Sequence, residues 1–282
     1  ACPASCSCGY RPDSHVVDIV DCSNRGLTSI PEIPYTVREI YLQDNNILEV
    51  SCFDFHNLKV LTKLNLSRNK IARLPWCSFV SLASLKELSM TRCQLIFLDT
   101  QLFTTLQNLS RLDLSTNNLT KLQNDTFLGL DSLQRWDFSS NGIKCLGGPI
   151  YGMPSLKYLD ISKNWSDRLN PLFFSELRNL TTLLLSQNRL GKSLATDIEG
   201  ISFSNLALLE ILDLSHNVIQ KLSEHAFERN ENLKVLNLSN NAIQHFVPSL
   251  SNNPKLVSLD LSNNPLEGFS SASCTQLRDI KL

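Results

Sequence analysis

The sequence predicts an α/β solenoid, a chain of similar turns stacked one on the next, each giving one short strand to a parallel sheet. Two observations predict it. The pattern L-x-x-L-x-L-x-x-N-x-L, seen in Leu109–Leu119, recurs from residue 37 to the last residue. Its asparagine, which we call the ladder position, returns at nearly constant intervals, with a period typical of solenoids. The ladder positions are Asn45, Asn69, Cys93, Asn117, Asn141, Asn164, Asn188, Asn217, Asn241 and Asn264.

Residues 1–36 are expected to form an N-terminal cysteine-rich cap that covers the open end of the solenoid core. Four of the nine cysteines lie here, at the spacing C-x3-C-x-C-x13-C. This spacing indicates a disulfide-stapled cap in an oxidising compartment, since a zinc site would need two paired ligand sets at tighter spacing. Four cysteines allow three pairings, of which we expect Cys2–Cys8 and Cys6–Cys22. The β-branched stretch His15–Cys22 predicts a short strand or hairpin.

Residues 37–276 are expected to form ten repeats, and residues 277–282 to begin a further, truncated one. In Leu112-Asp-Leu114 the two leucines point to one face of a strand and Asp113 to the other, so the leucines are core and the residues between them line the concave surface. The pattern is that of leucine-rich repeats, which predicts a horseshoe with a parallel concave β-sheet and a mostly irregular convex side. The ladder asparagine has a carboxamide that donates and accepts hydrogen bonds to neighbouring turns, and Cys93 is expected to replace it as a reduced thiol.

A second column lies ten residues after the ladder position and predicts aromatic packing on the convex side. Cys274 takes this position in its repeat and is expected to be a core thiol. Between Asn188 and Asn217 the segment 189–203 carries five extra residues. We expect a longer convex segment or a helical turn there, with a binding loop as the alternative. The phenylalanine column comprises Phe55, Phe79, Phe103, Phe127, Phe174 and Phe227, and also Phe203 once the five extra residues of its repeat are allowed for.

Two further cysteines, Cys52 and Cys77, lie at similar positions of adjacent repeats, and we predict a disulfide between them. Cys145 is expected to be an exposed, unpaired thiol. Seven N-x-S/T sequons occur, of which Asn164 is a ladder residue and is expected to be buried and unmodified. The candidate glycosylation sites are therefore Asn65, Asn108, Asn118, Asn124, Asn179 and Asn237, with Asn65 and Asn237 on the concave sheet.

The composition argues against several classes of function. The net charge is −1, so no global field favours nucleic acid or an acidic membrane, although a local basic patch is compatible with it. No apolar run is long enough to span a membrane. The five histidines have no metal-ligand spacing, no catalytic triad or carboxylate pair can be argued, and no cofactor is expected. The sequence predicts a protein that is not an enzyme.

The predicted concave face is monotonous, because its outward positions are mainly Asp and Ser. Binding hot spots are usually Trp, Tyr and Arg, so this face is interpreted as structural. Ligand contacts are expected on a lateral edge or on inserted segments, at Phe97, Trp165, Lys192 and His245.

With its four-cysteine cap, its long run of leucine-rich repeats, "LDLSxN" strands, irregular repeat lengths and many sequons, the whole chain resembles the N-terminal part of a Toll-like receptor ectodomain. The resemblance implies innate immune recognition of a microbial or damage-associated ligand, with pairing of two ectodomains as homodimer or heterodimer. It implies the extracellular or endosomal-lumenal part of a single-pass membrane receptor, with no direct membrane contact in this fragment. No C-terminal cysteine cap, transmembrane helix or signalling domain is present, so a truncated fragment is expected.

Two alternatives remain open. A variable lymphocyte receptor has a cap similar to Ala1–Cys8, but its antigen-binding concave face is diversified, unlike the Asp and Ser columns here. The other is an extracellular adhesion or matrix protein with leucine-rich repeats, against which the long interval between Asn188 and Asn217 argues only mildly.

Overall fold

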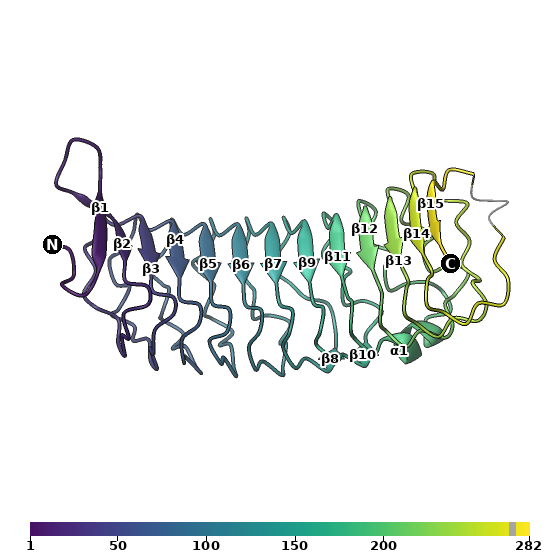
Figure 1. Cartoon of the computed structure of the whole chain (residues 1–282), viewed down its shortest axis with the longest axis horizontal. Coiled ribbons are helices and arrows are strands. Elements are labelled where there is room, and N and C mark those ends of the chain that lie inside the picture. The colour runs from purple at the N-terminus through teal and green to yellow at the C-terminus, as the bar shows by residue number, and fades with distance from the viewer. Residues whose placement is uncertain (271–274) are drawn as a thin grey trace. The chain divides into compact units, whose positions relative to one another are not determined.

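The computed structural model describes residues 1–270 and 275–282, so the expectation for Cys274 lies outside the described residues. The chain divides into two compact units, Ala1–Asn141 and Gly142–Leu282. Both are built of short strands joined by long loops, as Figure 1 shows. Among the described residues no helix is long and apolar enough to cross a membrane.

The first unit begins with an antiparallel hairpin, in which Cys8 pairs with Val20. The second hairpin strand then pairs in parallel with the first repeat strand, and each later strand pairs in parallel with the one before it. The strands are β1 (Ser7–Tyr10), β2 (Val17–Asp21), β3 (Glu39–Tyr41), β4 (Lys63–Asn65), β5 (Glu87–Ser89), β6 (Arg111–Asp113) and β7 (Arg135–Asp137).

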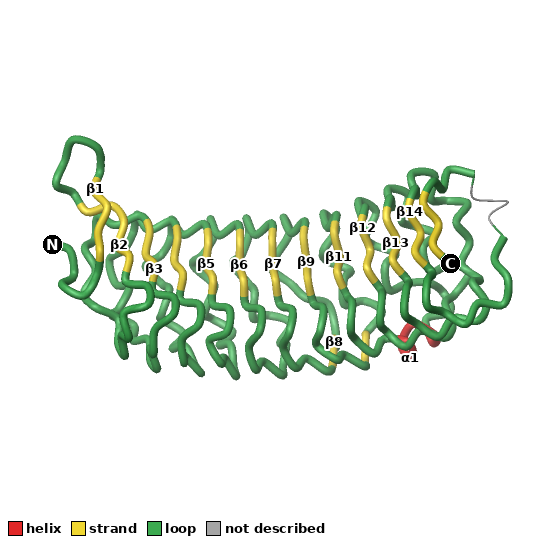
Figure 2. The backbone as a smooth tube through the Cα atoms, viewed as in Figure 1, coloured by secondary structure: helices red, strands yellow, loops and turns green. Residues whose placement is uncertain are grey.

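The second unit continues the same design with six parallel strands of its main sheet. A smaller sheet and one short helix lie on the loop side of the turns, away from the main sheet (Figure 2). The main strands are β9 (Tyr158–Asp160), β11 (Thr182–Leu184), β12 (Ile211–Asp213), β13 (Val235–Asn237), β14 (Ser258–Asp260) and β15 (Asp279–Lys281). The smaller elements are β8 (Cys145–Leu146), β10 (Arg168–Leu169) and α1 (Gly191–Thr196).

The helix α1 accounts for part of the five extra residues of the long repeat, which was expected to form a longer segment or a helical turn. It packs closely on the following turn, because Gly191 N donates to Asn217 O at 3.0 Å. A Cβ atom on Gly191 would lie only 2.1 Å from the carbonyl oxygen of Val218. The insertion is therefore seated on the solenoid and does not project as a free loop.

The core is built from the middle residue of each main strand. Leu64, Leu88 and Leu112 face one another in register through β4, β5 and β6, and Trp136 takes the same place in β7. All four side chains are buried, which confirms the predicted leucine face. Because the strands have only three residues each, their stability comes from stacking on neighbouring turns.

The ladder residues bind each turn to the one before it. Asn117 Nδ2 donates to Met90 O and to Leu114 O, each at 2.9 Å. Its Oδ1 accepts from the backbone N–H groups of Cys93 and Leu95 at 2.9 and 3.1 Å. A buried carboxamide thus satisfies backbone groups that the turn would otherwise leave without partners.

The convex column of phenylalanines is buried, and neighbouring rings are stacked in pairs. In the first unit Phe55 stacks on Phe79 with centroids 6.3 Å apart, and Phe103 on Phe127 at 5.8 Å. In the second unit Phe174, Phe203 and Phe227 form a continuous stack, with centroid distances of 6.1 and 6.4 Å.

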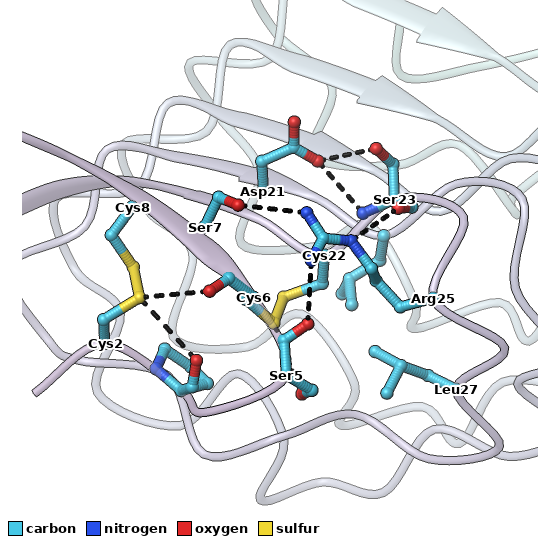
Figure 3. Close-up of a disulfide and its surroundings, with 12 residues drawn as sticks. Cys2, Ser5, Cys6, Ser7, Cys8, Asp21, Cys22, Ser23, Arg25 and Leu27 are labelled. Carbon is cyan, nitrogen blue, oxygen red and sulfur yellow. Dashed lines mark hydrogen bonds between the residues drawn. A yellow bond between two sulfur atoms is a disulfide. The ribbon is translucent and has the colours of Figure 1, made fainter.

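The cap contains the two expected disulfides, Cys2–Cys8 and Cys6–Cys22, whose Cα atoms are 6.0 and 4.5 Å apart. Figure 3 shows Arg25 beside Cys6–Cys22, donating to Ser7 Oγ at 3.0 Å and to the backbone carbonyl oxygens of Ser5 and Ser23. The guanidinium therefore ties the hairpin to the chain that enters the first repeat.

The other described cysteines also lie as expected. Cys52 and Cys77 form a disulfide, with Cα atoms 5.2 Å apart. Cys93 is free and buried, and Cys145 is free and exposed. The Cys93 thiol donates to Leu66 O at 3.0 Å.

Candidate binding surfaces

The sheet face is formed by the first and third residues of each main strand. Aspartates at the third position accept hydrogen bonds from a serine two residues further along the chain. Asp113 Oδ1 accepts from the Ser115 backbone N–H at 3.0 Å and from the Ser115 hydroxyl at 2.7 Å. Asp137 binds Ser139 in the same way, and Figure 3 shows the same turn at Asp21 in the cap. Asp-x-Ser is therefore a device that turns the chain at the end of a strand.

A shallow hollow of about 210 Å³ lies on the sheet face of the first unit. Its charges are of both signs: Lys63 Nζ lies 3.7 Å from Glu87 Oε2, and the exposed Arg111 stands beside them. Burial raises the pKa of Asp113, and the nearby Asp137 carboxylate adds to this. The residues that line the hollow offer polar contacts of both charges.

The four residues predicted to contact a ligand do not converge on one point. Phe97 belongs to the first unit, where it is 40% exposed and lies under the guanidinium of Arg73, 5.9 Å from its ring centroid. Trp165, Lys192 and His245 belong to three different turns of the second unit, and all three are exposed. His245 Nε2 lies 3.8 Å from Glu267 Oε2.

These four residues share one surface of the turn. We define the lateral face as the exposed residues from the one before each ladder position to the fourth one after it. A second backbone ladder supports this face in both units, since Ile96 N donates to Ala72 O at 3.0 Å and Asp167 N to Lys144 O at 3.0 Å. Side chains in successive turns of the lateral face are therefore neighbours in space.

Trp165 is the most prominent aromatic residue of the lateral face in the second unit. Its side chain is 54% exposed, and the guanidinium of Arg189, one turn further, lies 5.3 Å from its ring centroid. Arg189 was not among the contacts predicted from the sequence. Its position could have been found in the sequence, because Arg189 directly follows the ladder residue Asn188, just as Trp165 directly follows Asn164 one repeat earlier.

The sequons differ in accessibility. Asn108, Asn118, Asn124 and Asn179 are exposed, and Asn65 and Asn237 are half-buried on the sheet face. Asn108 and Asn179 donate through Nδ2 to the carbonyl oxygens of Ala83 and Pro154, each at 2.8 Å, on an edge away from the lateral face. Asn164 is fully buried in the ladder. No group of three His, Cys, Asp or Glu residues suited to a metal occurs in the part of the chain that the structure describes.

Comparison with known proteins is consistent with this architecture. A family model described as leucine rich repeat matches residues 36–95, 94–143, 147–190, 189–243 and 209–266. The chain is 28% identical to mouse keratocan over 274 residues, covering 95% of the chain and 53% of keratocan. It is 36% identical over 101 residues to Toll-like receptor 4 of Pinctada imbricata, covering 36% of the chain and 11% of that receptor. The chain thus spans about half of keratocan's length and a small part of the receptor's.

Proposed function

Because the chain belongs to the leucine-rich repeat family, we propose that it is a non-enzymatic extracellular binding protein of the adhesion or matrix type. The match to keratocan, a small leucine-rich repeat proteoglycan, supports this class because it extends over 95% of the chain. The three disulfides fit an oxidising compartment. The sequence favoured a Toll-like receptor ectodomain and left this class as one of two alternatives, the other being a variable lymphocyte receptor.

We assign partner binding to the lateral face, and one observation carries the assignment. The aspartates at the third position of the sheet strands are engaged in the turns that follow those strands, whereas the lateral face exposes Trp165 and Arg189 with no such internal role. Tryptophan and arginine are the residues that most often dominate binding energy.

The assignment is tested by retention of the chain on a decellularised fibroblast matrix. Arg189→Glu reverses a lateral charge, and Arg111→Glu reverses a charge on the sheet face that is also exposed. We expect Arg189→Glu to weaken retention about tenfold, a loss of about 1.4 kcal/mol, and Arg111→Glu to leave it within about twofold. The reverse pattern would move the site to the sheet face, and no retention of the unmodified chain would contradict the matrix function.

A Toll-like receptor ectodomain is the second candidate function, supported by the 36% identity over 101 residues to the Pinctada imbricata receptor. It predicts ligand-driven pairing of two copies, or of this chain with a related one. Sedimentation velocity with a panel of microbial lipids, glycans and nucleic acids, at neutral and acidic pH, measures this directly. Doubling of the 31.7 kDa mass with one of these ligands would favour the receptor, and an unchanged mass with all of them would argue against it.

A further inference from the structure

In the second unit the numbers of acidic and basic residues are equal, but the two kinds lie on different parts of the surface. Residues 142–282 contain eight Lys and five Arg against six Asp and seven Glu. The lateral face takes six of these cations and only two of the acids, and all eight side chains are exposed. The cations are Lys144, Lys163, Arg168, Arg189, Lys192 and Lys221, and the acids are Asp167 and Glu267.

The fold places these cations along consecutive turns. In the parallel pair of β8 and β10, Arg168 lies opposite Cys145. The next turn carries Lys192 on α1, which is tied to β10 by the Ser193 hydroxyl accepting from Leu169 N at 3.1 Å. Lys221 holds the same place in the turn after that. Figure 1 shows β8, β10 and α1 following one another along one edge of the unit.

The protein itself does little to neutralise this charge. Arg168 lies 3.4 Å from Asp167, but both side chains are more than half exposed, and such pairs contribute little. The four lysines of the set make no ion pair within the described residues. A row of like charges in which only Arg168 has a weak, exposed ion pair raises the local potential and favours an extended anion.

Trp165 adds a second kind of contact beside the cations. Its exposed ring lies against the Arg189 guanidinium, so an apolar plane and a forked donor are adjacent. A guanidinium binds tetrahedral oxyanions through paired N–H groups, and the ring offers a flat apolar surface for a sugar. A sulfated sugar has a sulfate oxyanion directly attached to a sugar ring, so it can contact the guanidinium and the indole ring at the same time.

Glycosylation would leave this face open. The accessible sequons of the second unit lie elsewhere, Asn179 on another edge and Asn237 on the sheet face, while Asn164 is buried. In the first unit, by contrast, Asn118 is exposed on the lateral face itself. A macromolecular ligand therefore meets no glycan on the lateral face of the second unit.

We propose that the lateral face of the second unit binds a sulfated polysaccharide, with Arg168, Lys192 and Lys221 contacting sulfates and Trp165 with Arg189 contacting a sugar and its sulfate. The inference rests on the proposed extracellular function, because sulfated polysaccharides are extended anions of that compartment. A nucleic acid fits less well, since single strands need several large stacking platforms, and among the described residues this face exposes one large aromatic ring, Trp165, besides the smaller imidazoles of His216 and His245.

The test measures binding of the full chain to immobilised heparin at neutral pH and physiological salt. The lateral variant Arg168→Glu/Lys192→Glu/Lys221→Glu is compared with Lys157→Glu/Arg178→Glu/Arg229→Glu. The control variant makes the same change in net charge at three exposed cations of the second unit outside the lateral face. Circular dichroism melting shows whether each variant folds, and Trp165→Ala provides a single-residue variant that changes no charge.

We expect heparin binding to fall at least about tenfold in the lateral variant and less than about threefold in the control, with the slope of log affinity against log salt reduced by about three only in the lateral variant. Trp165→Ala should weaken binding to heparin as well. Equal losses in the two triple variants, equal binding of desulfated heparin, or tighter binding of a single-stranded DNA of matched charge would each overturn the proposal. If heparin does not bind but the chain is still retained on the fibroblast matrix, this inference fails and the matrix function stands.

Discussion

Cys93 shows at the level of one residue how much the ladder depends on a carboxamide. Asn117 bridges neighbouring turns with five hydrogen bonds, whereas Cys93 offers a thiol, which is a weak donor and a weak acceptor. Burial raises the pKa of Cys93 to about 12, so the thiol stays protonated at neutral pH. Cys93 therefore occupies the ladder as a small, unreactive side chain. Cys145, the other free cysteine of the described residues, differs in that its thiol is exposed.

Replacing Cys93 by asparagine should restore the missing ladder bonds. We expect Cys93→Asn to raise the free energy of unfolding by about 1 kcal/mol, the net value of a typical hydrogen bond. The mirror variant Asn117→Cys should lower it by a similar or larger amount, because it leaves the Cys93 and Leu95 N–H groups without their acceptor. Urea unfolding measures both changes, and a loss of stability in Cys93→Asn would show that the turn is adapted to the thiol.

At the level of an element, each three-residue strand ends in a turn that its own side chains close. The Asp-x-Ser turn recurs at β6 and β7 and again in the second unit. Asparagine can replace the aspartate, since Asn65 accepts from Ser67 N and Asn237 from Ser239 N, each at 3.0 Å. The backbone bond is thus independent of the negative charge.

Asp113→Asn should therefore keep the turn and remove a pH-dependent cost. The pKa of Asp113 is raised by burial in the folded chain, so its contribution to stability is full below the unfolded pKa of about 3.9 and is lost as pH rises through the folded pKa. The melting temperature of Asp113→Asn minus that of the unmodified chain should therefore increase as pH rises from about 4. Glu49→Gln, which removes an exposed carboxylate, is the control, and a difference that does not change with pH would contradict the prediction.

At the level of the whole molecule, a net charge of −1 conceals an ordered distribution of charge. The aspartates at the third position of the strands are engaged in turns, and the lateral face of the second unit gathers cations. The sequons follow a related division, with Asn118 exposed on the lateral face of the first unit and none accessible on that of the second.

Glycopeptide mapping of the chain secreted from animal cells tests this distribution. We expect glycans at Asn108, Asn118, Asn124 and Asn179, where the side chains are exposed, and none at Asn164. The Asn164 carboxamide donates to Ile161 O at 3.1 Å inside the ladder, and a glycan on that nitrogen could not be accommodated there. A folded, secreted chain modified at Asn164 would contradict the structure.

One structural feature escaped the sequence analysis although its signal was present. Asn230 and Asn253 form a second buried ladder on the loop side, where Asn230 Nδ2 donates to Phe203 O at 3.0 Å and Asn253 Nδ2 to Phe227 O at 3.0 Å. Both lie at the same distance before a ladder position, in a column that is leucine or methionine in the preceding turns. An asparagine in an apolar column was the detectable sign.

The sequence by itself determined the turns, the strand faces, the ladder and the cysteine pairs of the cap, because each depends on spacing within one repeat or between adjacent repeats. Only the tertiary structure decided which exposed residues act together. Arg189 lies on Trp165, and Arg168, Lys192 and Lys221 lie in one row, although a full repeat separates successive members in the chain. The physical reason is that stacking makes neighbours of residues one period apart, and α1, tied to β10 through Ser193, holds Lys192 in this row at the same repeat position as Arg168 and Lys221.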